Sequence, residues 1–205
     1  SLRHVLRELE RIDVKVTSRL TIERMIAIRN ETAEEMRGIT TNLEEIRLEA
    51  FRRTLQEAGF PDEKLAKHCN DVYLKHRFED MELFDDVLPV LNTLRANFRL
   101  ALISNGNSYP ERIGLDGMFT SVIFSQDYRV EKPDPALFRI ALNELKCTEQ
   151  NLLHIGDSLT SDIEGAKRSG IQNVWLNRLR AENKLNIEPD YEISTLSELP
   201  GILGY

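Results

Sequence analysis

Residues 152–177 read LLHIGDSLTSDIEGAKRSGIQNVWLN, and this stretch decides the fold. The run "NLLHIGD" predicts a short buried strand, and "NVWLN" predicts another. Between them, Ser161 to Ser169 is predicted to form a helix that Gly170 closes. A strand, a helix and a second strand in succession are typical of a parallel sheet that is covered by helices.

The same alternation continues on both sides of this stretch. Before it, "FRLALISNG" predicts a strand that ends at Ser104, and "SVIFS" predicts a second; after it, "DYEIS" predicts a short fifth strand. Helices are expected from Val87 to Leu94, from Asp134 to Leu145 and over the C-terminal "STLSELPGIL". We therefore predict an α/β, Rossmann-like core over residues 81–205, with helices on both faces of a parallel sheet.

Residues 1–80 carry helical signals and no strand signal. Apolar residues recur at helical spacing from Leu2 to Ile12, and a second helix is predicted from Thr21 to Met36. A third helix is expected after Asn42, a suitable N-cap, and Pro61 is expected to open a fourth. We predict an N-terminal unit of four helices whose many Arg and Glu side chains form a solvated surface.

Composition narrows the choice of partners and compartment. The 205 residues carry a formal net charge of −7, which disfavours general binding to DNA, RNA or anionic membranes. No apolar run reaches membrane-spanning length. The two cysteines, Cys69 and Cys147, lie far apart, which favours unpaired thiols in a reducing compartment; a single disulfide is the alternative. A cytoplasmic protein is the default expectation, and the sequence sets no oligomeric state.

Three predicted strand or helix ends carry chemically suggestive residues. In an open α/β sheet, ligands bind at the carboxyl ends of the strands. Ser104–Gly106 follows the first strand, Lys132 precedes a proline in a loop, and Asp157 and Asp162 form an oxygen site suited to Mg²⁺. Each also has a plain interpretation: a turn, an ordinary helix start, and a helix N-cap with a first-turn charge.

In order and spacing, "LALISNG", "VEKPDPALF" and the stretch quoted first closely resemble the haloacid dehalogenase superfamily of hydrolases. Residues 1–80 resemble the helical cap that many members insert after their first strand. The resemblance implies Mg²⁺-dependent phosphoryl transfer from a small phosphorylated metabolite through an aspartyl-phosphate. The run over residues 156–177 looks most like a subgroup with 5′-nucleotidase-like and general phosphatase members, so a nucleoside monophosphate is the first candidate substrate.

The resemblance also implies a role for each matched residue. Asp157 would bind the Mg²⁺ that neutralises phosphate charge. Ser104 and the backbone N–H of Asn105 would donate hydrogen bonds to a phosphoryl oxygen, and Lys132 would supply positive charge to the same group. Asp162 would orient Lys132 or a metal-bound water.

One family motif is missing from the chain. The nucleophilic aspartate belongs to a DxDxT-like motif after a central first strand, and the nearest stretch, "LFDDVLPVL", has no strand before it. We interpret its Asp85 and Asp86 as helix-capping residues. We expect about ten to twenty residues before Ser1 in the gene product, with the missing strand, because without it two strands would expose unpaired edges. The chain as given is expected to be inactive.

Two other functions stay open. The dehalogenase branch displaces halide from 2-haloacids without metal and usually has uncharged residues in place of Gly156-Asp157, so their presence favours a phosphatase. A non-catalytic relative that binds a phosphorylated ligand or a protein partner is supported by the missing motif alone. Arg129 stands where relatives tend to have glycine, and it is strained if that position requires a positive φ.

Overall fold

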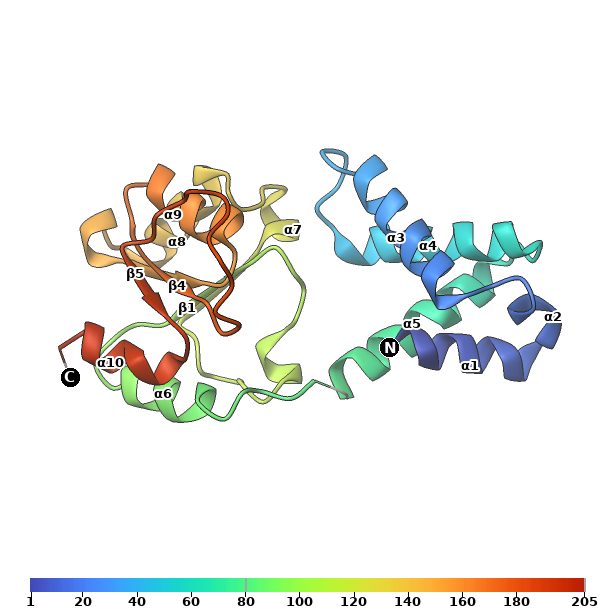
Figure 1. The fold of residues 1–205 in the computed structure, drawn as a ribbon, viewed down its shortest axis with the longest axis horizontal. Coiled ribbons are helices and arrows are strands. Elements are labelled where there is room, and N and C mark those ends of the chain that lie inside the picture. The colour runs from blue at the N-terminus through green and yellow to red at the C-terminus, as the bar shows by residue number, and fades with distance from the viewer. Residues whose placement is uncertain (80, 205) are drawn as a thin grey trace. The chain divides into compact units, whose positions relative to one another are not determined.

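The computed structural model describes residues 1–79 and 81–204, and the chain divides into two units, Ser1–Glu82 and Leu83–Tyr205. The first unit, coloured from blue to blue-green in Figure 1, consists of helices. The second unit, coloured from green to red, contains the strands and the remaining helices.

The regular elements of the helical unit, within the described residues, are all helices. They are α1 (Leu2–Ile12), α2 (Val14–Thr17), α3 (Ile22–Glu35), α4 (Leu43–Ala58) and α5 (Glu63–Glu79). Four of them were predicted, and the single turn α2 was not. It is separate from α1 because Asp13 takes an extended conformation and accepts a hydrogen bond from the Lys15 N–H.

Local signals set the ends of α4. The Asn42 side chain accepts hydrogen bonds from the backbone N–H groups of Glu44 and Glu45, as its predicted N-cap role requires. At the other end Gly59 adopts a left-handed conformation with φ 86°, which glycine adopts without strain. The helices then bury a common apolar core, which comprises Val5, Leu9, Val16, Leu20, Met25, Phe51, Leu55, Ala58, Ala66 and Cys69.

The second unit contains all five predicted strands. They are β1 (Ala101–Ser104), β2 (Ser121–Phe124), β3 (Leu153–Gly156), β4 (Gln172–Leu176) and β5 (Tyr191–Ile193). β1 pairs with β2, and β4 pairs with both β3 and β5. Every pairing is parallel, which confirms the predicted sheet type.

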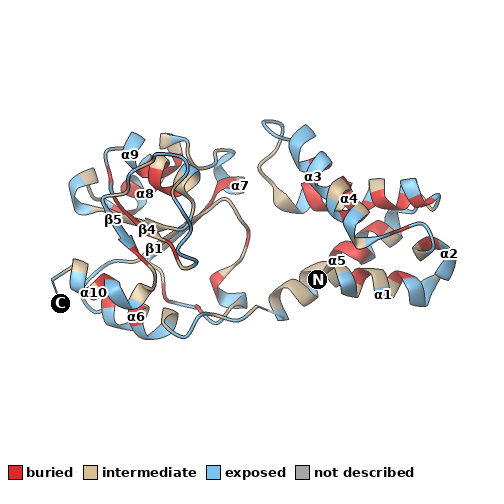
Figure 2. Cartoon of the chain, in the orientation of Figure 1, coloured by how far each residue is buried: buried red, intermediate tan, exposed pale blue. Residues whose placement is uncertain are grey.

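Helices cover these strands on both faces, as predicted. α6 (Val87–Leu94) and α10 (Leu199–Ile202) share an apolar cluster with β4 and β5. On the other face, α8 (Pro135–Leu145) and α9 (Glu164–Arg168) bury Phe138 and Ala166, and α8 also packs against β1 and β2. The buried residues of α8 form its inner side in Figure 2. A short helix, α7 (Ser125–Tyr128), follows β2.

Two sequence interpretations are settled in this unit. Asp86 directly precedes α6, at its N-cap position, but its side chain makes no capping hydrogen bond to that helix. Its two carboxylate oxygens instead accept from both Nη atoms of Arg178, at 2.9 Å each, and from the N–H of Leu196. The interpretation of Asp86 as a capping residue is therefore wrong. Arg129 does adopt a positive φ, 55°, so its backbone is strained as the conditional prediction stated.

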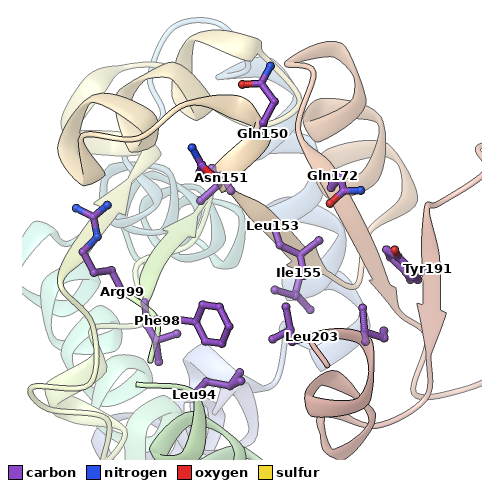
Figure 3. A pocket seen from close by; sticks show the side chains of 13 residues that line it. Leu94, Phe98, Arg99, Gln150, Asn151, Leu153, Ile155, Gln172, Tyr191 and Leu203 are labelled. Carbon is purple, nitrogen blue, oxygen red and sulfur yellow. The ribbon is translucent and has the colours of Figure 1, made fainter. Parts of the chain in front are cut away.

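An apolar pocket of about 300 Å³ is lined by residues 98–100, which directly precede β1, by Leu153 and Ile155 of β3, and by Ile202 and Leu203 near the C-terminus. Its apolar lining comes from both sides, and Figure 3 shows Leu94 and Phe98 facing Ile155 and Leu203 across it. Within the described residues, no strand pairs with both β1 and β3.

The remaining expectations concern cysteines and membranes. Cys69 and Cys147 are both free, which confirms that they do not form a disulfide, and burial raises the pKa of the Cys69 thiol to about 12. None of the helices in the described ranges is long and apolar enough to cross a membrane.

Candidate active site

The side chain of Asn105 fixes the loop that carries Lys132. Its Oδ1 accepts from the backbone N–H of Lys132 at 2.8 Å, and its Nδ2 donates to the Lys132 carbonyl at 2.9 Å. Asn105 directly follows β1, so the carboxyl end of that strand and the Lys132 loop are tied together. The family resemblance implied a role for the backbone N–H of Asn105 alone, and this use of its side chain was not predicted.

Lys132 and Asp162 form a buried ion pair. The Lys132 Nζ lies 2.6 Å from Asp162 Oδ1 and 3.1 Å from the carbonyl oxygen of Ile103. Only 10% of the Lys132 side chain and 5% of the Asp162 side chain are exposed. Since Ile103 belongs to β1 and Asp162 follows β3, one ammonium connects the two sheets at their carboxyl ends.

His154, on β3, contacts the same carboxylate and was not predicted. Its Nε2 lies 2.9 Å from Asp162 Oδ1. Burial alone would raise the pKa of Asp162, but the hydrogen bond from His154 and the charge and hydrogen bond of Lys132 hold that pKa well below its ordinary value. Asp162 is therefore an ionised acceptor. A polar residue inside the apolar run "LLHIG" was the signal that could have identified His154.

Gly156 lets the Asp162 carboxylate approach the strand end. A Cβ at position 156 would lie 2.1 Å from Asp162 Cγ, a distance that no side chain tolerates. The second oxygen, Oδ2, accepts from the Ser158 N–H at 3.0 Å. The local turn and the missing Cβ together hold the carboxylate in place, so the glycine of "IGDS" has a steric reason.

Asp157 is exposed, unlike Asp162. Ser158, not Asp157, caps the helical turn that follows, because its Oγ accepts from the Ser161 N–H at 3.1 Å. The plain interpretation of Asp157 as an N-cap is therefore wrong. Trp175 donates its indole N–H to the Asp157 carbonyl at 3.0 Å, a long-range support that the sequence did not reveal.

The oxygen ligands at the carboxyl end of β3 fit one part of a magnesium site. Asp157 offers a carboxylate at the end of β3, whereas the Asp162 oxygens are occupied by Lys132, His154 and Ser158. The described ranges contain no group of three or more His, Cys, Asp or Glu side chains arranged to hold a metal. Mg²⁺ commonly binds through one or two carboxylates together with water and substrate phosphate, so Asp157 fits as one ligand of such a site.

Ser104 completes the group of sequence-selected residues. Its Oγ accepts from the Gly106 N–H at 2.9 Å, which leaves the hydroxyl proton free to donate elsewhere. It follows Ile103, whose carbonyl oxygen binds the Lys132 ammonium. The hydroxyl and the cation thus come from the same strand end, and the arrangement supplies hydrogen-bond donors and positive charge suited to an anionic group.

Comparison with known proteins identifies the class. Residues 14–176 match the profile of the haloacid dehalogenase-like hydrolases, and the chain belongs to that family. Human N-acylneuraminate-9-phosphatase is 30% identical over 172 residues, which cover 80% of this chain and 69% of that protein. The predicted family and fold class are both confirmed.

Two solved structures resemble this one closely. The 2-haloacid dehalogenase from Pseudomonas syringae pv. Tomato DC3000 has a TM-score of 0.84 and 29% identity, with 98% of this chain and 88% of that chain covered. The HAD-hydrolase YfnB from Bacillus subtilis, crystallised bound to magnesium, has a TM-score of 0.70 and 26% identity, with coverages of 91% and 84%. Relatives of this chain thus include both phosphatases and dehalogenases.

Proposed function

We propose that this chain provides the phosphate-binding and metal-binding side chains of a Mg²⁺-dependent phosphatase that acts on a small phosphate monoester. The observation that carries the proposal is the buried Lys132–Asp162 pair at the carboxyl ends of β1 and β3. A buried ammonium that keeps an unused N–H is a preorganised partner for a phosphoryl group.

Each residue then has a part in binding the phosphoryl group. Lys132 holds positive charge against it, while the Ser104 hydroxyl and the Asn105 backbone N–H donate hydrogen bonds to its oxygens. Asp157 would hold the Mg²⁺, which supplies the charge that lets an anionic nucleophile approach an anionic ester. Asp162 keeps Lys132 in position, at 2.6 Å from its ammonium.

The nucleophile is proposed to come from a further strand. The apolar pocket is lined by β3 and by the residues that directly precede β1, and in the described part of the chain β1 pairs only with β2 and β3 only with β4. A strand that paired with both β1 and β3 would bury apolar side chains there and end beside Ser104 and Asp157. An aspartate at that end would attack the phosphorus atom and displace the alcohol of the ester, and water would then hydrolyse the aspartyl-phosphate to release inorganic phosphate.

Hydrolysis of a generic aryl phosphate tests the proposal. The gene product, including whatever its coding sequence encodes before Ser1, is assayed with Mg²⁺ and with EDTA, and 2-chloropropionate is offered in parallel. We expect phosphate release that requires Mg²⁺ and no chloride release. Chloride release that is insensitive to EDTA would instead establish the dehalogenase reaction, to which the similarity to the Pseudomonas syringae protein points.

Two substrate classes follow from different observations. The resemblance of residues 156–177 to nucleotidase-like members favours a nucleoside monophosphate, and the similarity to N-acylneuraminate-9-phosphatase favours an acidic sugar phosphate. A panel that contains both classes distinguishes them by kcat/KM. Equal, low values for all members would indicate that neither class is the substrate.

A further inference from the structure

His154 has one polar contact and one aromatic contact that together fix its ring. Its side chain is only 10% exposed, and the ring meets Phe138 edge to face, with centroids 5.0 Å apart and planes at 81°. Its Nε2 points at Asp162 Oδ1, 2.9 Å away. Because the pKa of Asp162 is strongly lowered, its carboxylate is ionised and only accepts hydrogen bonds, so Nε2 carries the donated proton.

The hydrogen-bonding capacity of Asp162 Oδ1 is filled by this contact. A carboxylate oxygen accepts along two lone pairs, and here one partner is Lys132 and the other is His154. Lys132 has three N–H bonds, of which one goes to Asp162 and one to the Ile103 carbonyl. The third is left for a ligand.

Removing the hydrogen-bond donor of His154 would leave one acceptor position of Asp162 Oδ1 empty. A buried carboxylate oxygen that loses a hydrogen-bond donor is stabilised by bonding to another donor, because a buried acceptor without a hydrogen bond costs free energy. Lys132 is already beside this oxygen, with its Nζ 2.6 Å from Asp162 Oδ1, and it has one further N–H that could be donated there. Lys132 would then turn further towards Asp162 and away from the position of a phosphoryl oxygen.

We propose that His154 is a positioning residue for the binding of a phosphoryl group. Its donated hydrogen bond fills the second acceptor position of Asp162 Oδ1, so that one N–H of Lys132 stays available for the substrate. This inference rests on the proposed function, since it assigns the reserved N–H to a phosphate ester. His154 does not touch the substrate; it acts through Asp162 and Lys132.

Two substitutions separate hydrogen-bond donation from packing. The amide nitrogen of His154→Gln reaches the place of Nε2, whereas His154→Met fills similar space with no donor. We expect His154→Met to lower kcat about tenfold with KM changed less than twofold, and His154→Gln to stay within about threefold of the parent. His68→Gln, on an exposed histidine of α5, is the matched control and should change nothing. An equal loss in the Gln and Met variants would overturn the proposal, because ring packing would then explain both.

A measurement without turnover keeps this inference separate from the proposed function. In protein labelled with ¹⁵N-lysine, the Lys132 ammonium resonance is assigned by its loss in Lys132→Met. It should shift in His154→Met and return towards the parent position in His154→Gln. An unchanged resonance in His154→Met would contradict the positioning role even if the enzyme is an active phosphatase. If His154→Met fails to fold, His154→Asn replaces it, because the shorter amide lies at the place of Nδ1 and misses Asp162.

Discussion

The helical unit and the α/β unit use oppositely charged residues in different ways. In the helical unit the pairs Arg24–Glu57 and Arg52–Glu63 lie on the surface, with each side chain at least 40% exposed. In the α/β unit, Lys132–Asp162 and Arg178–Asp86 are at most 20% exposed. Exposed pairs add little to stability because water and salt screen them, whereas a buried pair that loses one partner leaves a charge without solvation. The difference indicates where substitution has consequences.

The largest effect is expected at Asp157. Asp157→Asn in the gene product should abolish turnover and weaken Mg²⁺ binding, because the amide cannot supply the charge that offsets the metal. The fold should survive, since the side chain is exposed at the end of β3. Activity and Mg²⁺ affinity are measured together with the unfolding midpoint. Near-normal, Mg²⁺-dependent activity in the variant would remove Asp157 from the metal site.

The second largest effect on activity is expected for Lys132→Ala. Loss of one preorganised charge in a dry site costs about 10²–10³ in rate. Mg²⁺ affinity should stay close to that of the parent, because the proposed partner of Lys132 is the phosphoryl group. Steady-state kinetics with an aryl phosphate, together with a Mg²⁺ titration, test both parts. A tenfold or smaller loss of rate would favour the plain interpretation of this loop as a helix start.

Asp86→Ala tests the second buried pair through stability instead of activity. Hydrogen bonds from Arg178 lower the pKa of Asp86 from its ordinary 3.8. The contribution of this pair to the free energy of unfolding is therefore present above about pH 4 and is lost as the pH falls through the lowered pKa. At pH 7 the variant should lose about 2 kcal/mol of unfolding free energy.

Urea unfolding of the parent and of Asp86→Ala from pH 7 to pH 2.5 measures the difference in their free energies of unfolding at each pH. We expect the gap between the two proteins to close as Asp86 protonates in the parent. A gap that is equally wide at both ends of the range would show that the loss comes from packing and not from the Arg178 pair.

A smaller effect is expected at Arg129, whose φ of 55° suits glycine. Arg129→Gly should relieve local strain and stabilise the α/β unit by about 1 kcal/mol or less, because the added freedom of the unfolded chain offsets part of the gain. Thermal unfolding reports the shift. A lower midpoint in the glycine variant would indicate that the arginine side chain makes a stabilising contact.

The smallest effect is predicted on the helical surface. Arg52→Gln removes the pair with Glu63, in which both side chains are over 40% exposed. The unfolding midpoint and the turnover should both match the parent within error at physiological ionic strength. A clear loss of stability would break the contrast between the two units.

Local signals in the sequence predicted the elements of both units well. Asn42 and Gly59 mark the ends of α4 through contacts within a few residues. The strands β1 to β4 were predicted from short apolar runs bounded by turn residues. The short helix α2 was missed because one turn is too brief to show a helical period.

The candidate site was only partly predictable. Motif order identified Ser104, Lys132 and Asp162, but the partners of these residues depend on which strands lie side by side. The Asp86–Arg178 pair joins positions 92 apart, and the Trp175 indole reaches Asp157 from a neighbouring strand. Spacing along the chain carries no information on such contacts, so Asp86 was misassigned as a cap and His154 was overlooked.

Binding of inorganic phosphate tests most directly whether the buried cation of the α/β unit is the phosphate ligand. Calorimetry in the presence of Mg²⁺ compares the parent protein with Lys132→Ala and with the surface control Arg52→Gln. The parent and Arg52→Gln should bind phosphate equally, and Lys132→Ala should bind it at least about tenfold more weakly, the value of one charge-assisted hydrogen bond. Equal affinity in the parent and Lys132→Ala would contradict the account, because the buried ammonium would then have no part in holding the phosphoryl group.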